Sequence, residues 1–234
     1  MVKVLVGCPT SDYKAYCLKE YLNSVKSLNY DNYDVLIVDN SKTDDYAGKI
    51  KESGIKVIKM PYHESARQRI IDSRNKIREE FLAGNYDYFL SLEQDIIPPR
   101  DIIQRLLAYN RDVVAGLYFT VQNKTLSNGQ IIETLRPLVW VTLPDQDPNK
   151  MFYLDEKFAE KSNDFIQAYA TGLGCMLISR KVLEKIKFRF EGPSGFDDVH
   201  FCSDLEKNHI PLFVDLSVKC KHNITNWCWK GIKL

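Results

Sequence analysis

The first 119 residues alternate short apolar runs with helix-like segments, and this rhythm constrains the fold more than any other feature. The apolar runs are 2–10, 33–41, 55–61, 86–92 and 112–119. They have the length and composition of strands buried on both faces. The segments between them, near 18–28, 44–53, 64–82 and 99–109, predict helices. Strand–helix alternation is typical of a parallel sheet covered by helices, so we expect an α/β protein.

The second half lacks this rhythm. Two strands are predicted, at 134–143 and 166–179, and the polar stretch between them, 144–164, is expected to be a long loop. Helices near 180–187 and 197–208 and a last strand at 211–222 complete the prediction. The expected whole is a single domain, 1–234, with a mixed, mainly parallel central sheet flanked by helices.

Composition excludes several classes of protein. A chain of 234 residues with 44 % hydrophobic content is long enough for a sizeable core. Its formal net charge of +1 gives no basic field for nucleic acid. No apolar run of 18 residues occurs, and the N-terminus does not resemble a signal peptide. The six cysteines form no C-x-x-C pair, so we expect reduced thiols and a cytoplasmic protein.

Polar residues follow three of the predicted strands. They are Pro9-Thr10, Asp39-Asn40 and Glu93-Gln94-Asp95. In open α/β sheets, ligands bind beyond the carboxyl ends of the strands. No G-x-G-x-x-G or G-x-x-x-x-G-K-[ST] pattern is present, which disfavours a dinucleotide fold and excludes a P-loop.

Glu93 and Asp95 are separated by one residue, which puts both side chains on the same side of an extended backbone. Carboxylate oxygens at this spacing suit Mg²⁺ or Mn²⁺, which also accept substrate phosphate oxygens. The alternative is that the two acids solvate the strand end and that Asp95 caps the next helix. A second acidic pair, Asp197-Asp198, begins a predicted helix and is open to the same capping interpretation.

The order of these motifs resembles glycosyltransferase family 2, whose members have the GT-A fold. The matching segments are "CPTSDY", "VDNS", "DSRNKI", "EQD", "ATGLGCMLISR", "FDDVHFC" and "FVDLSVKCKH", in that order over residues 2–222. Two departures stand out. Glu93 replaces the first Asp of the family's D-x-D motif, and Asp197-Asp198 replaces a Glu-Asp pair.

The resemblance implies transfer of a sugar from a nucleotide-diphosphate donor to a carbohydrate or other hydroxyl acceptor, with inversion. Residues 1–119 would bind the donor and 120–234 the acceptor. Asp198 would be the general base, with Asp197 as second choice. A Mn²⁺ or Mg²⁺ ion would be held by Asp95 and His222, with Glu93 as a further candidate. The implied donor-binding residues are Pro9, Thr10, Asp39, Asn40, Arg74, Glu93, Gln94 and Asp95.

Several alternatives stay open. Gly172-Leu173-Gly174 would contact the donor sugar or form a bulge in an antiparallel strand. The altered "EQD" favours a second hypothesis, a GT-A-like module that binds a carbohydrate or a partner without catalysis. A nucleotidyltransferase is a weaker rival. It would normally need a Gly-rich, basic loop after the first strand to hold a triphosphate, and "GCPTSDYKAY" has one Gly and one Lys. The tail "NWCWKGIKL" (226–234) fits sugar stacking, packing or membrane-surface contact, and it is too short to support the last.

Overall fold

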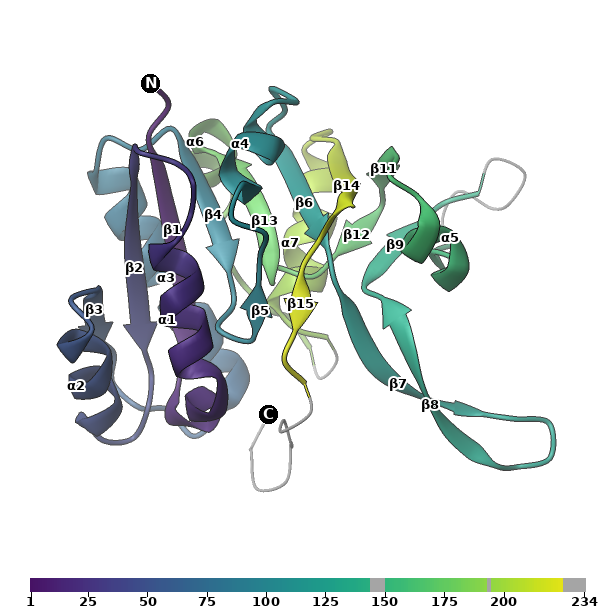
Figure 1. Cartoon of the computed structure of the whole chain (residues 1–234), viewed down its shortest axis with the longest axis horizontal. Helices are drawn as coiled ribbons and strands as arrows, with labels where there is room; N and C mark the ends of the chain where they lie inside the picture. Colours follow the sequence, from purple (N-terminus) through teal and green to yellow (C-terminus); the bar gives the residue numbers. More distant parts are fainter. Residues whose placement is uncertain (144–149, 193–194, 225–234) are drawn as a thin grey trace.

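The computed structural model describes residues 1–143, 150–192 and 195–224, and its centre is an eight-stranded sheet. The strands are β1 (Val4–Thr10), β2 (Tyr33–Asp39), β3 (Lys56–Lys59), β4 (Tyr88–Leu92), β6 (Val113–Leu117), β11 (Phe165–Ala168), β13 (Cys175–Ser179) and β14 (Leu212–Lys219). Their order is β11-β14-β6-β13-β4-β1-β2-β3 (Figure 1). All of them run in one direction except β11 and β13. The prediction of a mixed, mainly parallel sheet is confirmed.

Helices cover both faces of this sheet. One face carries α3 (Ala66–Ala83), α6 (Arg180–Lys185) and α7 (Asp197–Lys207), and the other carries α1 (Leu18–Lys26), α2 (Asp45–Glu52) and α4 (Ile102–Leu107). Side-chain alternation along β1 explains the two cores: Leu5 packs in the cluster that contains Phe81 of α3, whereas Val6 packs in the cluster that contains Tyr21 of α1. The α/β class is therefore confirmed.

Short elements complete the described chain. They are η1 (Asp12–Cys17), β5 (Ile96–Ile97), β7 (Phe119–Thr125), β8 (Ile131–Pro137), β9 (Val139–Val141), β10 (Phe152–Tyr153), α5 (Glu156–Lys161), β12 (Ala170–Thr171) and β15 (Lys221–His222). Strands β7 and β8 form an antiparallel hairpin that projects away from the main sheet (Figure 1). Strands β10, β9 and β12 form a small separate sheet, and β15 pairs with β5.

Three strand predictions in the second half are wrong in extent. The segment 166–179 holds three strands, because the chain leaves the main sheet after β11, pairs with β9 as β12, and returns as β13. The segment 134–143 is divided between β8 of the hairpin and β9 of the small sheet. The segment 211–222 is divided between β14 and β15, which belong to different sheets.

The expected loop at 144–164 is also wrong over part of its length. It contains β10 and α5, whose N-terminus is capped by the Asp155 side chain, which accepts a hydrogen bond from the Phe158 backbone at 2.8 Å. Residues 144–149 lie outside the described part of the chain, as does the tail 226–234.

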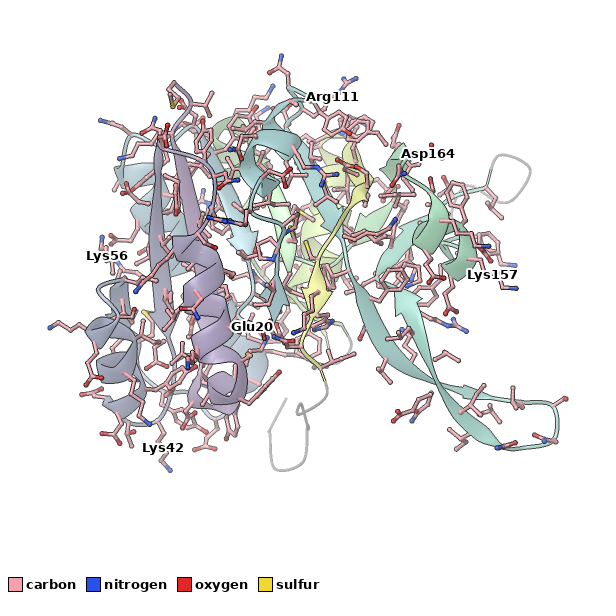
Figure 2. The ribbon with its side chains drawn as sticks, in the orientation of Figure 1. Glu20, Lys42, Lys56, Arg111, Lys157 and Asp164 are labelled. Atoms are coloured by element: carbon pink, nitrogen blue, oxygen red, sulfur yellow. The ribbon has the colours of Figure 1, made fainter. Side chains whose placement is uncertain are left out.

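The described surface is rich in charge. Figure 2 shows Lys42, Lys56, Arg111 and Lys157 at the periphery of the ribbon.

None of the helices in the described part of the chain is long and apolar enough to cross a membrane. Five cysteines are described, and each is buried and free; they are Cys8, Cys17, Cys175, Cys202 and Cys220.

Candidate active site

The carboxyl ends of β1, β2 and β4 meet at one edge of the sheet because these strands are parallel neighbours. A cavity of about 280 Å³ opens there. From the first half of the chain it is lined by six residues predicted to bind the donor: Pro9, Thr10, Asn40, Arg74, Glu93 and Asp95. From the second half it is lined by Leu173, Asp197, Asp198 and His222. The structure thus brings most of the predicted site into one cavity.

Asp95 and His222 face each other across this cavity. The antiparallel pairing of β15 with β5 puts His222 opposite Ile96, directly after Asp95. Its Nε2 lies 3.6 Å from Asp95 Oδ2, and its Nδ1 lies 2.8 Å from the Phe119 carbonyl oxygen. A carbonyl only accepts hydrogen bonds, so Nδ1 carries a proton, and Nε2 is the ring nitrogen that faces the carboxylate.

This donor set fits a divalent metal ion. Asp95 Oδ1 is buried and has no hydrogen-bond partner, so a carboxylate oxygen is left for another ligand. Two protein ligands are enough for Mg²⁺ or Mn²⁺, which complete their shells with water and phosphate oxygens. Among the described residues there is no cluster of three or more His, Cys, Asp or Glu side chains arranged to hold a metal. The chain's own contribution would therefore be Asp95 and His222.

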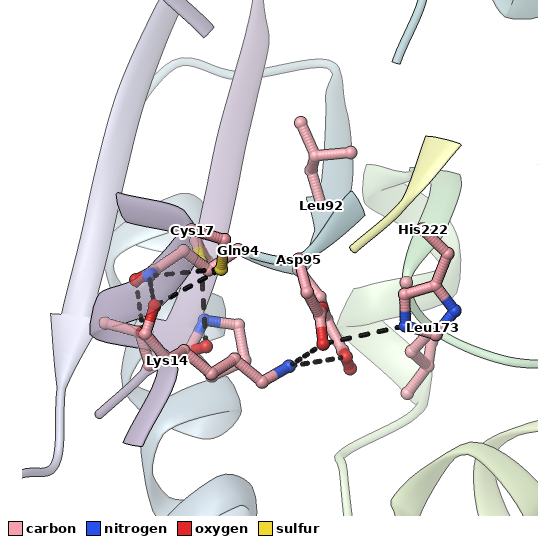
Figure 3. A network of polar contacts seen from close by, with 12 residues as sticks. Lys14, Cys17, Leu92, Gln94, Asp95, Leu173 and His222 are labelled. Carbon is pink, nitrogen blue, oxygen red and sulfur yellow. Dashed lines mark hydrogen bonds and ion pairs between the residues drawn. The ribbon is translucent and has the colours of Figure 1, made fainter. Parts of the chain in front are cut away.

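Lys14, from η1, already contacts both acids of the "EQD" segment. Its Nζ lies 2.9 Å from Asp95 Oδ2 and 3.3 Å from Glu93 Oε2. In Figure 3, Lys14 approaches Asp95 from one side and His222 approaches it from the other. Burial alone would raise the pKa of Asp95, but Lys14 and His222 outweigh it and hold that pKa below its usual value.

Arg74 joins the two acidic motifs. It lies on α3, is 1 % exposed, and forms ion pairs with Glu93 and Asp197. Its Nη1 also donates to Ser91 Oγ at 2.9 Å. Burial raises the pKa of the Asp197 carboxyl, and Arg74 opposes that rise. Glu93 is thus held between Arg74 and Lys14, two contacts that replace any need for a metal to neutralise it.

Asp198 is the less neutralised member of its pair. It sits in the first turn of α7, and its Oδ1 accepts a hydrogen bond from the Val199 backbone at 2.8 Å. Burial, and next the negative charge of Asp197, raise its pKa to about 6. A carboxylate with a raised pKa on a cavity wall has the properties of a general base.

Two predicted donor-binding residues, Asp39 and Gln94, do not line the cavity. Gln94 is 0 % exposed, accepts from Thr10 Oγ1 and donates to the Lys14 carbonyl, so it fixes the positions of two cavity residues. Asp39 accepts hydrogen bonds from the Ser41 backbone and hydroxyl through Oδ1. Its Oδ2 is buried without a partner, and burial raises its pKa. Asn40 reaches the cavity edge, and its amide donates to Ser73 on α3.

The Gly172-Leu173-Gly174 turn joins β12 to β13, and its two glycines make room for Tyr118. A Cβ on Gly172 would overlap Tyr118 Oη, and one on Gly174 would lie 2.8 Å from the same atom. The Gly174 backbone donates to that hydroxyl at 3.1 Å. Leu173 lines the cavity, and its carbonyl accepts from Ser91 Oγ. The segment is therefore a tight turn between two sheets rather than a bulge in one strand.

Sequence reasoning missed Lys14, Arg69, Tyr118 and Phe196 as cavity residues. A single Lys in a turn and a Tyr at a strand end are usually surface residues, so their types carried no signal. The available signal was position, since Lys14 follows the end of β1 by four residues and Tyr118 directly follows β6.

The chain belongs to glycosyl transferase family 2, whose model matches residues 13–187. Two solved structures are similar. A197 from STIV is 19 % identical, with a TM-score of 0.50 over 96 % of this chain and 87 % of that one. The mannosyltransferase PcManGT from Pyrobaculum calidifontis, in complex with GDP-Man and Mn²⁺, is 14 % identical, with a TM-score of 0.63 over 98 % of this chain and 58 % of that one. These likenesses confirm the GT-A fold. No curated protein sequence matches the chain.

Proposed function

We propose that this family 2 glycosyltransferase moves a hexosyl or related sugar from a nucleotide-diphosphate donor to a hydroxyl acceptor, with inversion. The observation that carries the proposal is a single cavity lined by three of the predicted residues. Asp95 and His222 face each other there, and Asp198, from the second acidic motif, lines the same cavity. The complex of PcManGT with GDP-Man and Mn²⁺ adds support, because that protein shares the fold.

The donor would bind through residues of the first half of the chain. Pro9, Thr10 and Asn40 border the cavity at the ends of β1 and β2, where a nucleoside fits. The donor-binding role of Asp39 stays a prediction, because its side chain is buried and does not line the cavity. The diphosphate would then extend toward Asp95 and His222. A bound Mn²⁺ or Mg²⁺ would neutralise charge on the leaving diphosphate.

The acceptor would enter from the second half of the chain, residues 120–234. Asp198 takes the proton of the acceptor hydroxyl as the hydroxyl oxygen forms a bond to the anomeric carbon of the donor sugar. The bond from that carbon to the diphosphate oxygen breaks on the opposite face, which inverts the anomeric centre. General-base catalysis of this kind contributes about 10²–10⁴-fold. Asp197, neutralised by Arg74, positions the start of α7 instead.

A thermal-shift panel tests the donor site. Nucleoside diphosphates and nucleotide sugars are added one at a time, with and without Mn²⁺, because a ligand that binds the native state raises the unfolding midpoint by mass action. We expect one base to stabilise the protein, and only when Mn²⁺ is present. The Asp95→Ala variant should lose that stabilisation, and unchanged turnover in this variant would exclude Asp95 as a ligand.

The second hypothesis is a binding module without catalysis. It is favoured by one observation: Glu93, at the altered first position of the "EQD" motif, forms ion pairs with both Lys14 and Arg74. Hydrolysis of the stabilising nucleotide sugar in the absence of acceptor separates the two hypotheses, since a binding module would leave it intact. The division into donor and acceptor halves and the cytoplasmic location stay predictions.

A further inference from the structure

The position of Lys14 raises a question that the proposed function does not answer. Its ammonium group lies against Asp95 Oδ2, which is the oxygen that also faces His222 Nε2. A cation therefore already stands beside the carboxylate that the metal would need. A metal ion on either oxygen of this carboxylate would stand close to the ammonium group, and the two cations would repel each other strongly in a partly buried site.

Charge within the cavity argues that Lys14 does not simply replace the metal. Among the described lining residues, the carboxylates are Glu93, Asp95, Asp197 and Asp198. The permanent cations are Lys14, Arg69 and Arg74. The four carboxylates exceed these three cations by one charge, which a protonated His222 would at most balance. A diphosphate adds about two more negative charges, so the loaded site needs a further divalent cation.

The two cations on Glu93 differ in burial and in side-chain structure. Arg74 is held by Glu93, Asp197 and Ser91 and is 1 % exposed. The Lys14 side chain is 16 % exposed, lines the cavity, and ends on a flexible four-carbon stem. Rotation about that stem would carry its ammonium from the carboxylates toward the cavity, while Arg74 still neutralises Glu93.

We propose that Lys14 is an exchangeable internal cation, which occupies Asp95 in the empty enzyme and transfers to the donor's diphosphate when the metal binds. The inference rests on the proposed function, since it needs a diphosphate ligand. It implies that metal and diphosphate bind cooperatively: Mn²⁺ alone must displace an ammonium group, whereas Mn²⁺ together with the diphosphate gives that group a new partner.

The first arm of the test uses Mn²⁺ alone. Lys14→Met removes the charge and keeps the apolar stem, and Lys19→Met, an exposed residue outside the cavity lining, is the matched control. Free Mn²⁺ is followed by its electron paramagnetic resonance signal. We expect Lys14→Met to bind Mn²⁺ roughly tenfold more tightly than the wild type and the control, because the competing cation is gone. Equal or weaker binding overturns the proposal.

The second arm uses ADP, CDP, GDP and UDP, one at a time, at saturating Mn²⁺, with calorimetry. The nucleotide that binds the wild type should bind Lys14→Met roughly tenfold more weakly, because the diphosphate loses a cation. Unchanged nucleotide affinity overturns the transfer step. If no nucleotide binds the wild type, the proposed function fails. The Mn²⁺ affinities of the first arm still test whether Lys14 competes with the metal ion at Asp95. Lys14→Gln, checked by circular dichroism, replaces Lys14→Met if that variant does not fold.

Discussion

Asp198 is the residue on which the proposed chemistry depends most directly. We predict that Asp198→Asn lowers kcat by about 10²–10⁴-fold, because an amide cannot accept the acceptor proton. KM for the donor should change little, since the proposed role of Asp198 is toward the acceptor. Single-turnover and steady-state assays measure both constants. The matched control is Asp204→Asn, which changes a partly buried carboxylate on the same helix that pairs with Arg189. Wild-type kcat in Asp198→Asn would exclude the base.

The raised pKa of Asp198 predicts a pH dependence with a definite sign. As a base it must be ionised, so kcat should rise with pH through about 6 and then level off. Stability should move the other way. The folded carboxyl binds its proton more tightly than the unfolded one, so its contribution is fully present at low pH and is lost as pH rises through about 6. In denaturant titrations between pH 4 and 8, the difference in stability between wild type and Asp198→Asn should grow from about pH 4 to about pH 6 and stay constant above that.

Arg74 has a different role, which its removal should reveal as a loss of stability. Arg74→Met leaves Glu93 and Asp197 without their shared cation, and removing one partner of a buried ion pair costs about 3–5 kcal/mol. Urea unfolding at pH 7 measures the change in free energy. Arg100→Met, on an exposed arginine that donates to the Ser27 carbonyl, is the control and should cost less than about 1 kcal/mol. Equal effects of the two changes would contradict a buried network.

At the scale of single residues, the sequence indicated the acidic residues and His222, but not the lysine that contacts them. Asp95, Asp197, Asp198 and His222 were found through the order of family motifs, and the structure brings them into one cavity. Lys14 was missed because its importance depends on η1, a short 3-10 helix that folds back over the end of β4. Nothing in the local sequence gives that contact, which spans 81 positions from Lys14 to Asp95.

At the scale of elements, the first half of the chain was predictable because its information is local. Strands β1, β2 and β3 are each followed directly by a helix, and only the two-residue β5 separates β4 from α4. The length and periodicity of the apolar runs are enough to distinguish these strands from the helices. The second half was not, because β11, β12 and β13 read as one apolar run yet belong to two sheets. A change of sheet at Tyr169 is decided by the partner strand β9, and periodicity carries no information about partners.

The β12–β13 turn offers a test of that tertiary control. Gly172→Ala should destabilise the protein by about 1–3 kcal/mol, because the new methyl group would meet Tyr118 Oη and Leu138. Gly48→Ala is the matched control: Gly48 lies within α2, and a methyl group added there would have nothing within 4 Å, so this change should stabilise by about 0.5–1 kcal/mol. Thermal and urea unfolding measure both. A neutral Gly172→Ala would mean that Tyr118 moves freely.

At the scale of the whole molecule, the β7–β8 hairpin stands apart from the two cores. Val121 pairs with Leu135 and Thr125 pairs with Ile131, and all four side chains are exposed. We predict that replacing residues 123–133 with Asn-Gly, which joins the paired residues Gln122 and Thr134 by a two-residue turn, shifts Tm by less than about 3 °C. Calorimetry measures it. A larger loss would show that the tip packs against the body.

The strand order has a consequence for synthesis on the ribosome. Strand β13 lies between β4 and β6, so both strands wait for a partner that is encoded far downstream. After Leu92 is made, 87 more residues must be added before Ser179 completes β13, which takes roughly 4–17 s at ordinary elongation rates. During that time the nascent chain carries an unpaired apolar strand edge, a substrate for chaperones. Slowing or pausing translation between codons 92 and 179 should therefore lower the yield of native protein.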